Sequence, residues 1–304
     1  MTQKDIPNCF LPVTQLREKL EEGLLSSLEL IEEYLERIRK HDPELGAYID
    51  VYEEESLKAA SASDMARASG HIIGPLQGIP VAVKDIIDIE GKITTGGSMV
   101  WKDRRSTLTA TLVRRMVEAG MIVLGKTHTV EFAMGSFGTN QHMGSPKNPW
   151  DLEEHRATGG SSAGTAAAVA AGLTPWGIGT DTGGSVRIPS AWCGLTGLKT
   201  SVGRISTHGV LPLSHTLDTP GPMCRSVEDA AILYRILAGP DEQDSRTVIH
   251  SVEDPFPELK KGISGFKLAR VSDSELENVD SENLEAYENS LKQLEKLGAS
   301  IHRV

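Results

Sequence analysis

The sequence predicts an α/β fold in which helices pack on a sheet. Three observations lead to this prediction. Short apolar runs that suit buried strands alternate with amphipathic helical patterns along the chain. Glycine-rich turns follow several of these runs, and the 304 residues include 30 glycines. Hydrophobic residues make up 39% of the chain and charged residues 24%, an ordinary globular composition that excludes wholesale disorder.

The first part of the chain predicts two helices. Ser26 and Glu29 form a capping-box pattern at the start of a helix over 27–40, whose apolar residues share one face. His41-Asp42-Pro43 should end this helix, because proline disfavours helical backbone in the residue before it. A second, polar helix is expected over 53–69.

The remaining elements alternate between strands and helices. In chain order we first expect a strand at 81–83 followed by Lys84 and Asp85, a helix at 109–119 and a strand at 121–124. A glycine–serine loop at 159–165 should then lead into a small-residue helix that extends to Ala171. A strand at 176–180 and a capped helix at 226–238 follow. Residues 240–262 have the composition of a linker or surface loop. A β-α-β pattern follows at 266–271, 282–297 and 300–304. Because the chain stops inside a predicted strand, a truncated chain is one expectation and a terminal strand is the other.

Charge and cysteine content limit the function classes. The formal net charge is −11, from 31 Lys and Arg against 42 Asp and Glu, which argues against nucleic acid or an anionic membrane as the main partner. Cys9, Cys193 and Cys224 are far apart, which argues against a disulfide framework and a zinc ribbon. No signal-peptide pattern opens the chain, and the longest small-apolar run, 166–173, is too short to span a bilayer. We therefore expect a cytoplasmic protein.

Two short motifs match known patterns in an unsuitable context. Residues 120–127 fit the P-loop pattern, but their variable positions read Met-Ile-Val-Leu and predict a strand instead of a phosphate-binding loop. Residues 160–164 fit the nucleophile-elbow pattern around Ser162, with His208, His215 and Asp218 as candidate partners. The polar stretch 151–158 before them does not look like the buried strand that an elbow requires.

A third set of residues has the components of an acyl-transfer site. Singly, Lys84 suits a solvated strand end, Ser161 and Ser162 suit a helix N-cap, and Ser185 suits a turn. Together they supply a serine nucleophile, a relay serine and a lysine base that burial could keep neutral. Backbone N–H groups of the turn before Ser185 could converge on one oxyanion.

These segments resemble the amidase signature family. The resemblance rests on Gly78 to Asp85 (Gly-Ile-Pro-x-x-x-Lys-Asp), on Gly159-Gly160-Ser161-Ser162 before an alanine-rich helix, and on Gly179 to Arg187 (Gly-Thr-Asp-Thr-Gly-Gly-Ser-Val-Arg). Asn148-Pro149-Trp150 and 193–199 are also similar to family segments. Ala163 departs from the pattern, since the family usually has glycine there. The similarity runs from about residue 10 to the end and is densest over 78–222.

The resemblance implies a fold and a set of roles. The implied fold is a central mixed β-sheet flanked by helices in a single domain over 1–304, with a helical region at about 10–70, a catalytic core at about 71–240 and a C-terminal segment at about 263–304 that lacks the family's C-terminal part. The implied roles are Ser185 as nucleophile, Ser161 as a relay serine held by a cis peptide bond, Lys84 as base, Thr182, Gly183 and Gly184 as oxyanion hole, and Ser162, Asp181 and Arg187 as supports. No metal and no cofactor are implied.

The resemblance leaves three functions open. The first is an amidase that hydrolyses a carboxamide C–N bond of a small-molecule substrate through an acyl-enzyme. The second is the glutaminase-type A subunit of a tRNA-dependent amidotransferase, which would act with a partner protein of the same enzyme. The third is a catalytically silent truncated member. A homo-oligomer is a further expectation, because an unpaired sheet edge recruits partners.

Overall fold

The computed structural model describes residues 6–247, 252 and 254–303. It divides into two compact units, Met1–Glu253 and Asp254–Val304. The prediction of a single domain over 1–304 stays a prediction. Of the predicted elements, only the last residue of the strand at 300–304 and residues 248–251 and 253 of the 240–262 linker lie outside the described residues.

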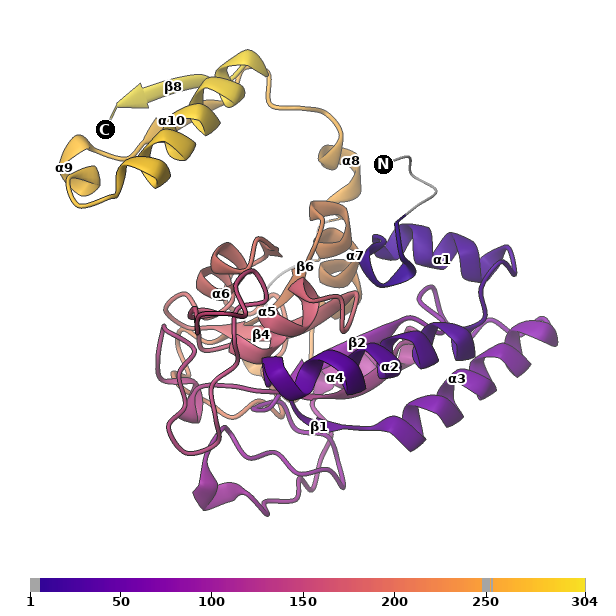
Figure 1. The fold of residues 1–304 in the computed structure, drawn as a ribbon. Coiled ribbons are helices and arrows are strands. Elements are labelled where there is room, and N and C mark those ends of the chain that lie inside the picture. The colour runs from indigo at the N-terminus through magenta and orange to yellow at the C-terminus, as the bar shows by residue number, and fades with distance from the viewer. Residues whose placement is uncertain (1–5, 248–251, 253, 304) are drawn as a thin grey trace. The chain divides into compact units, whose positions relative to one another are not determined.

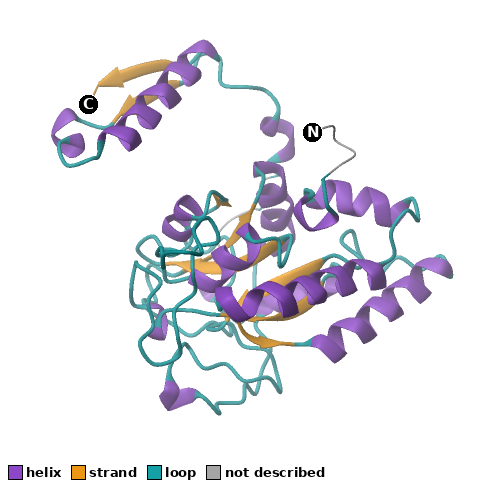
Figure 2. Ribbon diagram, in the orientation of Figure 1, coloured by secondary structure: helices purple, strands orange, loops and turns teal. Residues whose placement is uncertain are grey.

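The first unit is built on a mixed six-stranded sheet with helices packed around it (Figures 1 and 2). The strand order is β1-β3-β2-β4-β6-β5; β3, β2 and β4 run parallel, while β1, β6 and β5 pair antiparallel with their neighbours. The strands are β1 (Tyr48–Val51), β2 (Pro80–Lys84), β3 (Ile122–Thr127), β4 (Trp176–Asp181), β5 (Thr196–Gly197) and β6 (Thr219–Cys224). The central mixed sheet that the resemblance implied is therefore confirmed.

Seven α-helices and four short 3-10 helices accompany this sheet within the described part of the first unit. They are η2 (Asn8–Phe10), α1 (Val13–Glu21), α2 (Ser27–Leu45), α3 (Glu53–Ala68), η3 (Met99–Trp101), α4 (Thr111–Glu118), η4 (Glu131–Ala133), α5 (Ala163–Ala170), α6 (Arg187–Trp192), α7 (Val227–Leu237) and η5 (Ser245–Thr247). Helix α5 consists of small residues and lies against β2 and β4 in the middle of the sheet. The absence of large side chains lets this helix approach the sheet closely.

Helix α2 corrects one sequence prediction. The capping box of Ser26 and Glu29 is present, but the helix continues through Pro43 to Leu45 instead of ending at residues 41–43. Pro43 has no N–H to donate within the helix, but only two helical residues follow it. Gly46 then ends the helix with a left-handed backbone, φ 64°. The Asp42 carboxylate accepts hydrogen bonds from the backbone N–H groups of Ala47 and Tyr48. These bonds fix the direction in which the chain leaves α2 towards β1.

The second unit is a small β-α-β arrangement. Strands β7 (Lys267–Arg270) and β8 (Ser300–Arg303) pair in parallel, and α10 (Ser281–Lys296) connects them. Two single-turn helices, α8 (Phe256–Leu259) and α9 (Asp273–Leu276), complete the unit. The predicted β-α-β pattern is thus present. Among its described residues only Ala299 is buried, so the unit has very little core of its own.

Candidate active site

Lys84 is a fully buried lysine whose hydrogen-bond partners are hydroxyl groups. It is the last residue of β2, and its Nζ donates to Ser161 Oγ at 2.7 Å and to Thr180 Oγ1 at 2.9 Å. Burial lowers the pKa of Lys84 to about 7, against the opposing charges of Asp181 and Asp218. A large fraction of this amine is therefore neutral near pH 7, and a neutral amine can accept a proton.

Ser161 lies in the glycine–serine loop that precedes α5. The peptide bond between Gly160 and Ser161 is cis, as the resemblance implied for this position. The Ser161 carbonyl accepts hydrogen bonds from Val130 N at 3.2 Å and from Thr129 Oγ1 at 3.1 Å. These bonds fix the backbone of a fully buried residue, and its hydroxyl is directed at the Lys84 amine.

Ser162 occupies the N-cap position of α5 but does not cap the helix with its side chain. Its Oγ donates to Thr180 O at 3.3 Å and accepts from Thr180 N at 3.2 Å, while its own N–H donates to Ser185 O at 3.3 Å. Ser162 therefore joins the loop before α5, the end of β4 and Ser185. The nucleophile-elbow interpretation fails, because no strand precedes this serine within residues 151–158.

Asp181 supports the turn that carries Ser185. Its carboxylate accepts hydrogen bonds from Gly184 N at 2.8 Å and from Val186 N at 3.2 Å. It also accepts two hydrogen bonds from the Arg187 guanidinium, at 2.9 and 3.0 Å. Burial alone would raise the pKa of Asp181, but the Arg187 and backbone hydrogen bonds outweigh it and lower that pKa. The carboxylate therefore stays ionised and holds the turn in one conformation.

The backbone N–H groups of this turn differ in availability. Gly184 N is already bound to Asp181. Within the described residues, the amides of Thr182 and Gly183 make no hydrogen bond to the protein, and no atom lies within 4 Å of the position of a Cβ at Gly183. Two of the three N–H groups expected to form an oxyanion hole are therefore free to donate, whereas the third is engaged.

The structure brings the sequence-predicted residues together to different degrees. Lys84, Ser161 and Ser162 are joined by hydrogen bonds, either directly or through Thr180. Asp181 follows Thr180 in the chain and forms hydrogen bonds with Arg187. Ser185 is 9% exposed. Its carbonyl accepts a hydrogen bond from the N–H of Ser162, in the loop before α5. In the part of the chain that the structure describes, no hydrogen bond joins the hydroxyls of Ser161 and Ser185.

Sequence reasoning did not identify Thr180 as part of the site. This residue contacts both Lys84 and Ser162, although an alternating strand pattern alone does not distinguish it from other β4 residues. Its position at the end of a buried strand, next to Asp181, is the signal that could have found it.

The P-loop match is a strand, as predicted. Residues 122–127 form β3, and Gly120 takes a left-handed backbone, φ 90°, just after α4. The four residues between the two glycines are therefore Met121 and the first three residues of β3, which present no phosphate-binding loop.

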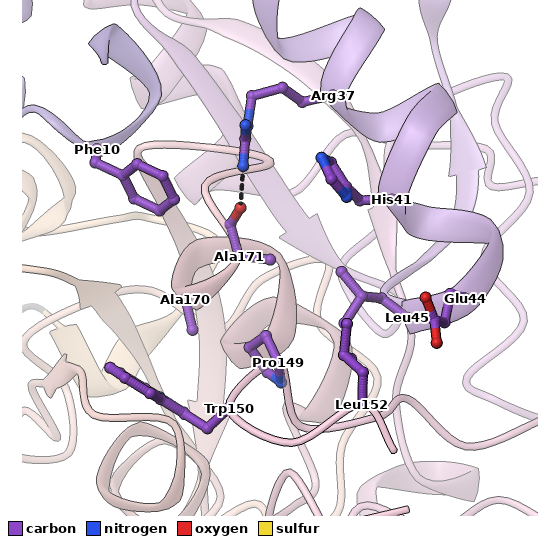
Figure 3. Close-up of a pocket in the computed structure, with 10 residues that line it drawn as sticks. All are labelled: Phe10, Arg37, His41, Glu44, Leu45, Pro149, Trp150, Leu152, Ala170 and Ala171. Carbon is purple, nitrogen blue, oxygen red and sulfur yellow. Dashed lines mark hydrogen bonds between the residues drawn. The ribbon is translucent and has the colours of Figure 1, made fainter. Parts of the chain in front are cut away.

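A separate surface hollow of about 350 Å³ lies between α2, the 149–152 segment and the end of α5 (Figure 3). Phe10 and Trp150 line one part of it, and Arg37 and His41 line another. The Arg37 guanidinium donates to Ala171 O at 2.8 Å, so it caps the C-terminus of α5. None of the predicted site residues lines this hollow.

The described residues contain no group of three or more His, Cys, Asp or Glu side chains arranged to hold a metal ion. In the same part of the chain, no helix has the length and apolar character needed to cross a membrane.

The buried lysine, the two serines and the carboxylate-braced turn define a site typical of serine-dependent acyl transfer. The Amidase family model matches residues 29–304, and the chain belongs to this family. It is 42% identical over 289 residues to the A subunit of the glutamyl-tRNA(Gln) amidotransferase of Coxiella burnetii, a match that covers 95% of this chain and 59% of the relative.

Solved structures give the same fold. The A subunit of the glutamyl-tRNA(Gln) amidotransferase from Thermotoga maritima superposes with a TM-score of 0.86 at 37% identity, over 99% of this chain and 62% of that one. The native peptide amidase from Stenotrophomonas maltophilia superposes with a TM-score of 0.88 at 36% identity, over 96% of this chain and 61% of that one. The chain thus spans about three-fifths of the length of these relatives.

Proposed function

We propose that this protein is an amidase that hydrolyses a carboxamide C–N bond through an acyl-enzyme on Ser185. The observation that carries the proposal is the 2.7 Å contact between the buried Lys84 amine and Ser161 Oγ. A lysine whose pKa lies near 7 and that bonds to a hydroxyl is a suitable proton acceptor at neutral pH. The similarity to a peptide amidase supports the same chemistry.

In the proposed first step, Ser185 Oγ attacks the carbonyl carbon of the amide. Its proton passes to Ser161 Oγ, which gives its own proton to Lys84 Nζ. The negative charge that develops on the carbonyl oxygen is stabilised by the amides of Thr182 and Gly183. When the C–N bond breaks, Lys84 returns the proton through Ser161 to the leaving nitrogen.

In the second step, water attacks the ester formed on Ser185. The same relay removes a proton from the water and returns one to Ser185 Oγ, so the enzyme is regenerated with no net change in its protonation. Asp181, Arg187 and Ser162 keep the turn and the loop in place during both steps.

The proposal is tested with a broad fluorophosphonate probe and intact-mass measurement of the purified chain. We expect one adduct on the wild-type protein and none on Ser185→Ala, while Ser201→Ala, which removes an exposed hydroxyl from a neighbouring segment, is labelled normally. Lys84→Ala should lose labelling at neutral pH while circular dichroism shows a retained fold. A folded wild-type chain without an adduct would contradict the amidase proposal and favour a catalytically silent member.

The second candidate is a glutaminase-type A subunit of a tRNA-dependent amidotransferase. It is favoured by the 42% identity to a protein of that name. A protein of this kind would release ammonia from glutamine and act with a partner protein. Glutaminase activity that appears only when the partner is added would support this candidate, whereas hydrolysis of simple amides by the isolated chain would support the first.

The proposed function also implies binding partners and a location in the cell. We propose a small-molecule amide as substrate, and as protein partner either a second copy of the chain or another component of an amidotransferase. Direct nucleic-acid binding is not proposed, because the net charge is −11. A cytoplasmic location is supported by Cys9, Cys193 and Cys224, which are buried free thiols.

A further inference from the structure

Asp218 is a buried carboxylate that contacts the turn before Ser185. It immediately precedes β6 and is 7% exposed. Its Oδ1 accepts a hydrogen bond from Thr182 Oγ1 at 2.5 Å. Its Oδ2 accepts hydrogen bonds from Leu213 N at 2.9 Å and from Ser214 N at 3.0 Å. One side chain therefore connects the 213–214 segment to the first residue of the Ser185 turn.

Asp181 and Asp218 hold this turn at its two ends. Asp181 binds the amides of Gly184 and Val186, on the side nearer Ser185. Asp218 binds the side chain of Thr182, at the beginning of the turn. The antiparallel pairing of Asp181 with Thr219 in β4 and β6 brings the two carboxylates to the same end of the sheet. Among the described residues, Asp218 alone forms a hydrogen bond with the Thr182 side chain.

We propose that Asp218 is a positioning residue for the reaction on Ser185: by binding the Thr182 hydroxyl, it fixes the Thr182 and Gly183 amides where the oxyanion forms. This inference rests on the proposed amidase function. It goes beyond the role considered for Asp218 from the sequence, which was as a partner of Ser162, because the carboxylate binds Thr182 instead.

The charge of Asp218 gives a second, independent consequence. Two carboxylates act on Lys84 by their charge: Asp181, which is paired with Arg187, and Asp218. Lys126 pairs with Val83 in the sheet register, so Lys126 lies on the opposite face, where its partner is Asp85. The negative charge of Asp218 raises the pKa of Lys84, so removing that charge should lower this pKa.

Three variants separate the hydrogen bond from the charge. Thr182→Val removes the hydroxyl and keeps both the side-chain shape and the Asp218 charge. Asp218→Asn keeps an oxygen acceptor and removes the charge, whereas Asp218→Ala removes both. Thr216→Val is the matched control, because it deletes an exposed threonine hydroxyl from the same loop without touching Asp218.

The first measurement is the rate of fluorophosphonate labelling of the full chain as a function of pH. We expect Asp218→Ala to label about 10- to 100-fold more slowly and Thr182→Val about 10-fold more slowly at the pH optimum. The labelling rate should fall at acidic pH as Lys84 becomes protonated. This acidic limb of the pH profile should move to lower pH in Asp218→Asn and stay in place in Thr182→Val. A purely structural role would leave this limb unmoved in Asp218→Asn, and wild-type rates with an unmoved limb in all three variants would overturn the inference.

The second measurement does not depend on activity. Hydrogen exchange followed by mass spectrometry should show faster exchange of a peptide spanning 181–187 in Asp218→Ala and Thr182→Val, with peptides of α2 and the Thr216→Val control unchanged. Unaltered exchange of this peptide would overturn the positioning role even in an active enzyme. If wild-type protein is not labelled, the amidase proposal fails, while the exchange result still decides whether Asp218 fixes the turn.

Discussion

Lys84 and Lys126 are both fully buried on neighbouring strands of one sheet, but among the described residues only Lys126 has a carboxylate within ion-pair distance. Lys126 Nζ lies 3.5 Å from Asp85 Oδ1 and donates to Thr94 Oγ1 at 2.7 Å. The described hydrogen bonds of Lys84 run to two hydroxyls. Burial lowers the pKa of both lysines, but at Lys126 the adjacent Asp85 carboxylate opposes this shift. Because an adjacent anion favours the protonated amine, Lys84 is better suited than Lys126 to act as a base.

The pH dependence of activity should report Lys84. The reaction needs the neutral amine, and burial lowers the pKa of Lys84 to about 7. We therefore expect kcat/KM to fall about tenfold per pH unit below that value and to level off above it. Initial rates on a simple amide between pH 5 and 9 measure this limb. A flat profile across this range would argue against a lysine base.

The stability of the protein should also depend on Lys84. Its folded pKa is lower than that of the unfolded chain, so between about pH 7 and 10 the unfolded state binds more protons and the free energy of unfolding rises with pH. Lys84→Met lacks this contribution. Urea unfolding at several pH values should show the free energy of wild type gaining on that of Lys84→Met by up to ~1.4 kcal/mol per pH unit. Parallel curves would contradict a depressed pKa.

The Lys126–Asp85 pair should behave as a buried ion pair. Lys126→Met leaves the Asp85 carboxylate buried without its counter-charge, and we expect a loss of about 3–5 kcal/mol in the free energy of unfolding. Adding Asp85→Asn to Lys126→Met removes that unpaired charge. The double variant should therefore be less destabilised than the sum of the single variants, as measured by a double-mutant cycle in urea.

Two adjacent glycines in the Ser185 turn should differ in their tolerance of alanine. Gly184 has φ 131°, and a Cβ there would lie 2.6 Å from Ile188 Cδ1. Gly183 has open space at the same position. We expect Gly184→Ala to cost about 1–3 kcal/mol of stability and Gly183→Ala less than about 1 kcal/mol. Thermal unfolding of the two variants measures the difference, and equal midpoints would show that the turn adapts to either side chain.

The sequence by itself determined the family-specific motifs and most of the regular elements. The predicted helices at 53–69, 226–238 and 282–297 correspond to α3, α7 and α10, and the capping residues located the starts of α2 and α7. Lys84, Ser161 and Ser185 could be selected because their local patterns are specific. Such signals are local, since they depend on residues within one helix turn or one loop.

Other features depended on the folded chain. The end of α2 beyond Pro43 and the two-residue strand β5 carry weak local signals, so tertiary contacts decide them. In the sequence, Lys84 and Lys126 both come shortly after an apolar run that predicts a strand, and only the packing gives one of them a carboxylate partner. Proton affinity depends on burial and on charges contributed by distant segments. Which lysine can serve as a base, and which carboxylate holds the Ser185 turn, was therefore decided by the tertiary structure.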